Sequence, residues 1–306
     1  MRFSIITPSF RGGRWLKLCI ASVADQEVSS EFRVLSSEGG AELGTRDSEL
    51  GTPNVEHIIQ DAGSDDGTLD WLTTDARVQA FVEKDRGMYD AVNRGYRRAR
   101  GELLAYLNCD EQYLPGALAK VAAFFERRPE VDVVFGHCLV VDGAGAYICE
   151  RRSLTPQLLH TWTASNLAFL TAVTFLRRRV LDTHQLWFNA DYRDAGDQDW
   201  ALRLVKAGLK TAVLPEFLSV FTETGVNMNL GANALRERQE FHATAPRRAR
   251  LLAPAALLHF RWRRWRAGHY RCTPHAYAIY TQDSPQRRKT FHVLHPTFRW
   301  VRPPTA

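Results

Sequence analysis

A short polar run directly after an apolar run holds the residues of this sequence whose types could bind a metal ion. Residues 103–107 are apolar, and Asn108, Asp110 and Glu111 follow them. Such a run predicts a buried central strand of a parallel sheet, and open α/β sheets bind ligands beyond the carboxyl ends of their strands. Because side chains alternate along an extended chain, Asn108 and Asp110 point to one side. Their oxygens suit Mg²⁺ or Mn²⁺ that already carries phosphate, although a simple capped strand end has the same residue pattern.

Two other acidic positions could take part in the same chemistry. Asp61 follows an apolar run at residues 55–60, where a carboxylate can accept a hydrogen bond from a nucleobase N–H. Asp197 and Asp199 precede an apolar helical pattern that starts at Trp200. A carboxylate there could act as a general base, and it could equally cap the helix and complement its dipole.

The elements that must position these acids follow from the spacing of apolar residues. A strand at residues 2–10, a turn with Gly12 and Gly13, and a helix form the usual opening of a nucleotide-binding βαβ unit. Neither GxGxxG nor GxxxxGK[ST] is present, which argues against a dinucleotide fingerprint and a Walker P-loop. Later runs predict strands at 55–60, 80–83, 131–135 and 139–141, and helices at 88–100 and 115–127.

Composition places the chain among ordinary globular proteins. Its 306 residues, of which 45% are hydrophobic and 24% charged, are enough for one large α/β domain or a domain with an appendage. Five scattered cysteines without a CxxC pair argue for a reducing compartment and against disulfides or zinc. No signal peptide precedes the first strand, and no apolar run reaches the ~20 residues of a membrane span. We therefore expect a cytoplasmic protein.

Charge divides the chain into two parts. Residues 242–306 contain thirteen Lys or Arg and one acid, Asp283, whereas residues 1–241 carry a net charge of −6. The segment 247–266 mixes Arg with Trp and Leu, which suits the anionic inner face of the plasma membrane, nucleic acid, or packing on the acidic body. Pro254 predicts a broken helix there. The polar stretch 28–54 predicts either a solvated insertion or a functional flap.

Four segments, taken in order, resemble the large family of inverting nucleotide-sugar glycosyltransferases with the GT-A fold, often called family 2. They are SIITPSF, EHIIQDAGSDDGT, EKDRGMYDAVNRGYRRARGELLAYLNCDE and AGDQDWALRLVKAG, and they cover most of residues 1–230. The wording DRGMYDAVNRG is closest to bacterial members that build capsule, exopolysaccharide or lipid-linked sugars.

The resemblance implies a fold, a domain division and an activity. The fold is a Rossmann-like α/β GT-A domain at 1–230, with a mostly parallel mixed sheet flanked by helices. Residues 1–111 form its nucleotide-sugar half and 112–230 its acceptor half, and 231–306 form a basic C-terminal helical appendage. The activity is transfer of a sugar, by default from a UDP-sugar with Mn²⁺ or Mg²⁺, to a hydroxyl of a glycan or lipid-linked acceptor.

The resemblance also carries over individual site residues. Thr7, Pro8 and Ser9 match the loop that lines the nucleotide, Asp61 matches the carboxylate that reads the nucleobase, and Arg86 matches a basic position near the phosphates or base, with Lys84 as its alternative. The usual metal motif is Asp-x-Asp, and this chain has Asn108 in the first place. Asp110 is then the direct metal ligand, with Glu111 helping through water. Asp197 matches the catalytic base, which leaves Asp199 as the helix cap.

The acceptor region and the competing functions are less sharply defined. Residues 158–179 lie where the family builds its acceptor cleft, so Trp162, Asn166 and Thr174 are candidate acceptor contacts, each of which also fits a core or rim position. One competing function is a nucleotidyltransferase, which would release pyrophosphate. The other is a non-catalytic nucleic-acid-binding protein, which is unlikely because such a protein has no use for these ordered acids.

Overall fold

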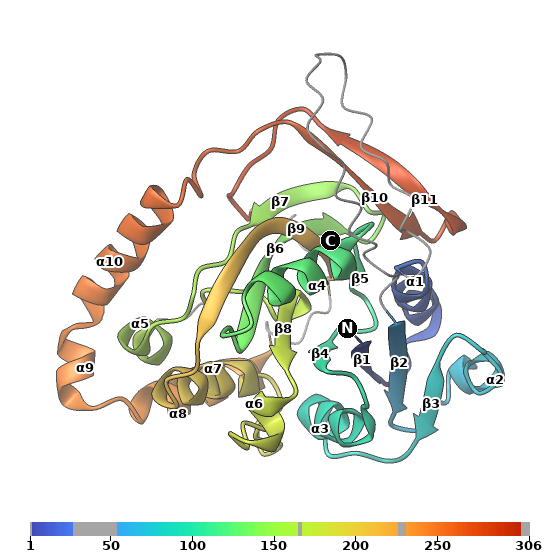
Figure 1. Ribbon diagram of the computed structural model, residues 1–306, viewed down its shortest axis with the longest axis horizontal. Coiled ribbons are helices and arrows are strands. Elements are labelled where there is room, and N and C mark those ends of the chain that lie inside the picture. The colour runs from blue at the N-terminus through green and yellow to red at the C-terminus, as the bar shows by residue number, and fades with distance from the viewer. Residues whose placement is uncertain (1, 27–53, 165–166, 226–230, 301–306) are drawn as a thin grey trace.

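The computed structural model describes residues 2–26, 54–164, 167–225 and 231–300. The predicted insertion or flap at 28–54 lies outside the described residues apart from Asn54, and so does the candidate acceptor residue Asn166. Its main feature is one nine-stranded sheet with the strand order β3-β2-β1-β4-β8-β6-β9-β5, with β7 paired to β6 (Figure 1). This mixed sheet, flanked by helices, confirms the predicted α/β fold class.

The first four strands form a parallel half-sheet. They are β1 (Arg2–Ser9), β2 (Asn54–Asp61), β3 (Gln79–Val82) and β4 (Leu103–Tyr106). Ser9 lies opposite Asp61, and Asp61 lies opposite Val82. Ile6 lies opposite Tyr106, and all these strands run in one direction. Their carboxyl ends therefore meet at one edge, and β4 is central because β1 and β8 flank it, as the sequence predicted.

The second half of the sheet is mixed. It contains β5 (Gln112–Tyr113), β6 (Val133–Asp142), β7 (Tyr147–Arg151), β8 (Thr174–Arg177) and β9 (Thr211–Glu223). Strand β8 is antiparallel to β4 and β6, whereas β6 and β9 are parallel. The sequence predicted two strands where β6 is one. Gly136 separates the two apolar runs in the sequence, but it lies inside β6. A Cβ at this position would be 2.3 Å from the Leu218 side chain of β9, so the close approach of β9 requires glycine here.

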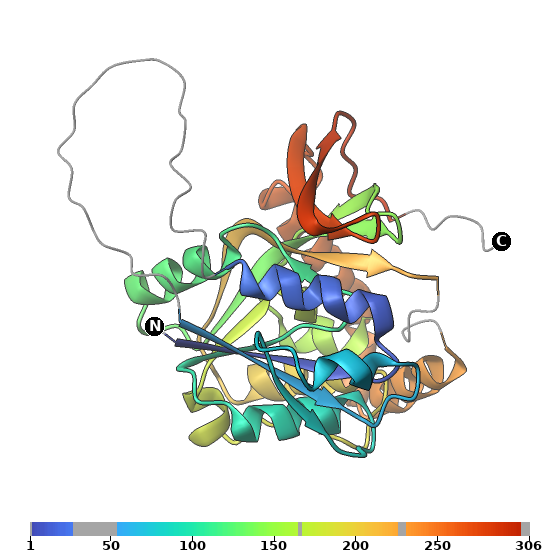
Figure 2. The same cartoon turned by 90° about the vertical axis from the view of Figure 1, so that its right-hand side faces the viewer.

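Helices cover both faces of the sheet (Figure 2). Helices α1 (Gly13–Ala24), α2 (Thr68–Leu72) and α4 (Ala117–Arg127) pack on one face, where α1 contributes Cys19 and Val23 to the core. Helices α3 (Met88–Arg98), α6 (Arg179–Asp182) and α7 (Gly196–Lys206) pack on the other, where Trp200 is fully buried. Helix α5 (Leu158–Thr163) and the 3-10 helix η2 (Thr171–Val173) lie between β7 and β8 in the chain. Apolar stripes on these helices are what hold them to the sheet.

The basic tail begins with helices and ends in a hairpin. Helix α8 (Ala232–Ala243) is followed by α9 (Arg247–Leu251) and α10 (Ala253–Arg266), with Pro254 in the first turn of α10, so the predicted broken helix is confirmed. The antiparallel strands β10 (His275–Thr281) and β11 (Ser284–Val293) were not predicted. Tyr277 and Ile279 of this hairpin share an apolar cluster with Leu139 of β6. The predicted boundary at residue 230 thus separates elements that pack together.

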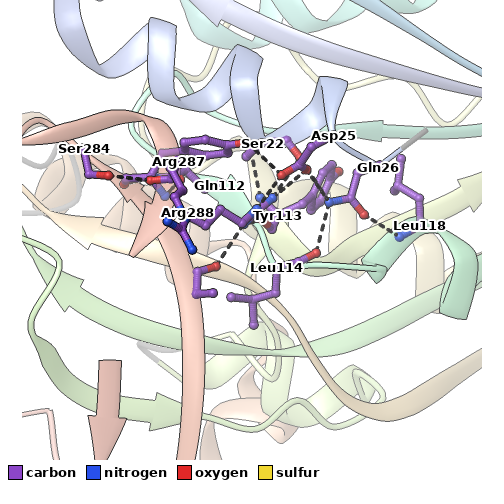
Figure 3. Close-up of polar contacts among 12 residues, drawn as sticks. Ser22, Asp25, Gln26, Gln112, Tyr113, Leu114, Leu118, Ser284, Arg287 and Arg288 are labelled. Atoms are coloured by element: carbon purple, nitrogen blue, oxygen red, sulfur yellow. Dashed lines mark hydrogen bonds and ion pairs between the residues drawn. The ribbon is translucent and has the colours of Figure 1, made fainter. Parts of the chain in front are cut away.

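A partly buried polar network fastens the hairpin to the end of α1 and to β5 (Figure 3). The Arg288 side chain is 11% exposed, and its Nη2 lies 2.7 Å from Oδ1 of Asp25 at the end of α1. The Gln112 side chain accepts from the backbone N–H of Tyr280 and donates to its carbonyl, both at 2.9 Å. Because Gln112 directly follows Glu111, the hairpin supports the strand that leaves the predicted metal motif.

Candidate active site

Asp61 is fully buried at the carboxyl edge of the parallel strands. Its Oδ1 accepts from the backbone N–H groups of Gly63 at 2.9 Å and Ser64 at 2.7 Å, and its Oδ2 accepts from the hydroxyls of Ser9 and Ser64 at 2.8 Å. A carboxylate has about four acceptor sites, so all of them are used within the protein. Asp61 thus ties the loop after β1 to the loop after β2. The predicted contact with a nucleobase stays a prediction, and it requires that a base N–H replace one of these donors.

The other predicted nucleotide-lining residues also turn inward. Thr7 is fully buried, and its hydroxyl lies 2.9 Å from Nε2 of His57. Pro8 is buried and the Ser9 hydroxyl is held by Asp61. Any contact of this segment with a nucleotide therefore runs through its backbone or through residues just beyond it, such as the exposed Phe10.

The predicted metal motif, from Asn108 to Glu111, is a turn in which the Glu111 side chain hydrogen-bonds to the backbone of Asn108. Oε2 of Glu111 accepts from the backbone N–H of Asn108 at 2.9 Å, and the Glu111 N–H donates to the Asn108 carbonyl at 3.0 Å. Burial raises the pKa of Glu111 to about 8, with a further contribution from Asp110. Burial likewise raises the pKa of Asp110 to about 6. Neither carboxyl group has an ion-pair partner among the described residues, so the charge of an ionised Asp110 is not compensated there.

This turn fits a divalent cation only in combination with a substrate. Across the described ranges, no group of three or more His, Cys, Asp or Glu side chains is placed to hold a metal. Mg²⁺ usually needs only one or two protein carboxylates when substrate phosphates supply the other oxygens. Oδ1 of Asn108 is also buried and, within the part of the chain that the structure describes, has no hydrogen-bond partner. The donor set of Asp110 with this oxygen therefore matches a cation that arrives with phosphate.

Asp197 lies in the first turn of α7 and is held by Tyr89 of α3. The Asp197 N–H donates to the Tyr89 hydroxyl at 3.1 Å, and a Cβ on Gly196 would lie 2.6 Å from the Tyr89 ring, so only glycine permits this approach. Burial raises the pKa of Asp197 to about 6. A general base works best with a pKa near the operating pH, and Asp197 is shifted in that direction. Sequence reasoning missed Tyr89, although it stands directly inside the quoted DRGMYDAVNRG run.

A row of aromatic rings connects Asp197 to the metal motif. Tyr106, two residues before Asn108, meets Phe188 edge-on with ring centroids 5.5 Å apart. Phe188 stacks on Tyr89 at 5.3 Å, and Tyr89 contacts Asp197. Three aromatic side chains thus link Asp197 to the turn at Asp110, 87 positions earlier in the sequence.

The neighbouring acid has a different task from the one predicted. Asp199 pairs with Arg203 at 2.8 Å, one turn along α7, and the N-cap residue of the helix is Ala195, which provides no side-chain cap. The prediction that Asp199 caps the helix is therefore wrong. The side-chain oxygen of Asp197 accepts from the adjacent Gln198 N–H at 2.8 Å, which is a local contact within the first turn.

The remaining predicted residues lie at the rim or inside the protein. Arg86 is 68% exposed and reaches toward Asp191, 4.0 Å away, in the loop that precedes Asp197. The Trp162 indole donates to Thr244 at 3.1 Å, and the Thr174 hydroxyl donates to the Leu170 carbonyl at 3.0 Å. Arg86 thus reaches from the loop before α3 to the loop before α7, whereas the other two side chains have hydrogen-bond partners within the protein.

Residues 4–184 match the family described as Glycosyl transferase family 2, and because they make up more than half of the chain, the protein belongs to that family. A "PGL/p-HBAD biosynthesis glycosyltransferase" of Mycobacterium tuberculosis is 28% identical over 211 residues, which is 66% of this chain and 68% of that protein. An "Uncharacterized glycosyltransferase EpsJ" of Bacillus subtilis is 21% identical over 72% of this chain and 60% of its own length.

Solved structures show the same fold. TarS 1-349 of S. aureus in complex with UDP-GlcNAc superposes with a TM-score of 0.56 at 17% identity, covering 87% of this chain and 73% of that one. The mannosyltransferase PcManGT of Pyrobaculum calidifontis in complex with GDP-Man and Mn²⁺ gives 0.51 at 19% identity, covering 84% and 74%. The chain spans only 44% of a longer TarS chain. These likenesses establish the fold, and substrates must be argued from this chain's own residues.

Proposed function

We propose that the protein is an inverting glycosyltransferase that moves a sugar from a nucleoside diphosphate sugar to a hydroxyl of a glycan or lipid-linked acceptor. The observation that carries this proposal is the placement of Asp197, whose pKa is raised to about 6 and which is joined to the turn at Asp110 through aromatic rings. One carboxylate is available for a proton and the other for a cation. Family membership supports the same reaction class.

Each acid has one step in this reaction. Asp197 accepts the acceptor hydroxyl's proton while the oxygen attacks the sugar C1 from the face opposite the diphosphate, and the C1–O bond to the diphosphate breaks. General-base assistance of this kind contributes roughly 10²- to 10⁴-fold to the rate. Asp110 would hold a divalent cation, which when bound stabilises the negative charge of the leaving diphosphate. Glu111 positions Asp110 through its bond to the Asn108 N–H.

The donor is proposed from the family and from the ligands of two structural neighbours. We take a UDP-sugar with Mn²⁺ or Mg²⁺ as the default, and GDP-sugars as the variant. Two structural neighbours support both choices, since one was solved with UDP-GlcNAc and the other with GDP-Man and Mn²⁺. The acceptor rests on the mycobacterial relative, whose name assigns it to PGL/p-HBAD biosynthesis.

Product analysis tests the reaction. Release of a nucleoside diphosphate that depends on both metal and acceptor is the expected result, whereas release of pyrophosphate indicates a nucleotidyltransferase. Donors are found first by metal-dependent thermal stabilisation, because a ligand at 100 times its Kd adds about 2.7 kcal/mol to the free energy of unfolding. If no nucleotide sugar stabilises the protein with Mn²⁺ or Mg²⁺, the proposal fails.

We also propose that α9 and α10 lie on an anionic membrane surface. In the described residues, no helix is long and apolar enough to cross a membrane. Leu258, Trp262 and Trp265 are 66%, 48% and 66% exposed, and they follow one stripe of α10 beside exposed Arg261. An apolar stripe with flanking Arg is the pattern of an interfacial helix.

Vesicle binding tests the membrane proposal. The double variant Trp262→Ala, Trp265→Ala should lose binding to phosphatidylglycerol vesicles. Leu235→Ala, which removes an exposed side chain of α8, should keep it. Equal binding by the wild type and the double variant contradicts the proposal, and salt-sensitive RNA binding in place of vesicle binding would favour the nucleic-acid alternative.

A further inference from the structure

A small cavity lies between the end of β7, the segment 167–170 and helix α10. Its volume is about 70 Å³. A single water needs ~10–15 Å³ of such space, so the cavity has room for several waters or for one compact polar group. The residues that define its chemistry are Arg151, Arg152, Ser153, Phe169, Phe260 and Arg264.

The cavity has an excess of positive charge. Arg152 is compensated, since its Nε lies 2.7 Å from Oε1 of the buried Glu150. Arg151 and Arg264 have no carboxylate within 4 Å among the residues that the structure describes. Burial, and then Arg264 itself, lowers the pKa of Arg151. Two guanidinium groups facing one partly desolvated space repel each other, and an anion between them would remove that cost.

Aromatic rings hold these two side chains in place. The Arg151 guanidinium lies over the Trp300 ring at 5.6 Å, and the Arg264 guanidinium lies over the Tyr270 ring at 5.0 Å. Cation–π contacts orient a guanidinium without neutralising its charge. The N–H groups of both arginines therefore remain able to bind a planar or tetrahedral oxyanion, for which the guanidinium fork is well suited.

The cavity lining belongs to the same apolar cluster as the helix that carries Asp197, because Phe169 and Phe260 pack with Trp200 of α7. The side chain of Gln198, next to Asp197, donates to the Ala164 carbonyl at 3.0 Å. Leu167, three residues further along, lines the cavity. Three residues of extended chain span at most roughly 11 Å, which bounds the distance from Ala164 to the cavity wall. The cavity lining is therefore connected to the first turn of α7, which carries Asp197.

We propose that Arg151 and Arg264 bind a phosphate group carried by the acceptor and so orient the acceptor hydroxyl toward Asp197. This inference rests on the proposed glycosyl transfer for the identity of the acceptor, and on the cavity alone for the binding of phosphate. It defines the acceptor class as phosphorylated, whether the phosphate belongs to a lipid headgroup or to a soluble glycan.

Phosphate titration tests the site directly. Inorganic phosphate binding is measured calorimetrically with UDP and Mn²⁺ in excess, so that the donor site is filled. Arg264→Gln and Arg151→Gln should each weaken phosphate binding roughly 10- to 100-fold, as expected for loss of a charged hydrogen-bond donor. Arg287→Gln removes the same charge from an exposed position of β11 and should leave the affinity within about twofold of wild type. Each variant's thermal unfolding shows that it is folded, and two variants on different elements guard against a folding defect in one.

Three results would overturn the proposal. They are no phosphate binding by the wild type with the donor site filled, equal loss in Arg287→Gln, and unchanged affinity in both cavity variants. The link to the acceptor is tested by inhibition: inorganic phosphate should raise the KM for acceptor and leave the KM for donor unchanged, and Arg264→Gln should abolish this effect. Competition with the donor instead would contradict an acceptor role. Vesicles with and without phosphatidic acid, compared with inorganic phosphate, identify a lipid or a soluble source. UDP binding in the same titrations reports separately on the proposed function.

Discussion

Replacing Asp197 with Asn separates the proposed catalytic role of this residue from a structural one. The amide keeps the shape and the contact with the Tyr89 hydroxyl through the backbone N–H, but it cannot accept the acceptor proton. Turnover should therefore fall by roughly 10²-fold or more, which corresponds to about 3 kcal/mol or more in the activation barrier. Donor affinity should not change, because Asp197 lies at the acceptor side. In the wild type, kcat/KM should rise with pH through about 6, where the carboxylate loses its proton.

The same substitution should not lower stability. The pKa of Asp197 is raised in the folded protein, so the folded state binds the proton more tightly than the unfolded state between the two pKa values. The free energy of unfolding consequently falls as pH rises from about 4 to about 6, and at neutral pH the buried carboxylate carries a cost. A shift from 3.8 to about 6 corresponds to about 3 kcal/mol at most. Asp197→Asn removes this cost, so its Tm at pH 7 should equal or exceed that of wild type.

Asp199→Asn is the matched control. It breaks the partly exposed pair with Arg203, which is worth about 0.3–0.5 kcal/mol for such a spacing, and it should keep most of the activity. The assay is initial-rate measurement of nucleoside diphosphate release, with Tm recorded for each variant. Normal turnover of Asp197→Asn would refute the assignment of Asp197 as the base, whatever the Tm of the variant.

Three further variants and one control test the predicted metal ligand and two residues that hold the surrounding elements in place. Asp110→Asn should abolish the Mn²⁺ dependence of nucleotide binding, and wild-type turnover in excess chelator would contradict this. Arg288→Met removes the ion pair with Asp25, which keeps the hydrogen bond from the Tyr280 hydroxyl, and should lower the free energy of unfolding by about 2 kcal/mol. Lys289→Met breaks an exposed pair and should cost less than about 1 kcal/mol in chemical denaturation. Gly196→Ala forces a Cβ against a buried ring and should lower both the Tm and kcat, with a cost of about 1–3 kcal/mol; unchanged kcat would show that this approach is not needed.

The sequence by itself determined the parallel half of the fold and the location of the acidic edge. Runs such as 103–107 are short, apolar and bounded by polar residues, and that local pattern suffices to predict a buried strand with a ligand-binding end. Asp61 and Asp110 could be assigned to strand ends for the same reason. The family resemblance added Asp197, which no local pattern distinguished from Asp199.

Tertiary structure alone decided which residues meet across long separations in the chain. From the sequence, Gly136 was predicted to break a strand, but Leu218 of a distant strand packs against it. Asp199 was predicted to cap a helix, but it pairs with Arg203. Tyr277 and Ile279 do alternate as in a strand, but Arg288 in the partner strand is buried only because Asp25 lies opposite it. Whether such a residue is buried depends on partners that are distant in the chain, which compensate its charge or leave room for it. A local stretch of sequence does not contain these partners. The arginine-lined cavity arises in the same way, because β7 and α10 contribute one unpaired guanidinium each, among the described residues, only once the tail has folded back onto the body.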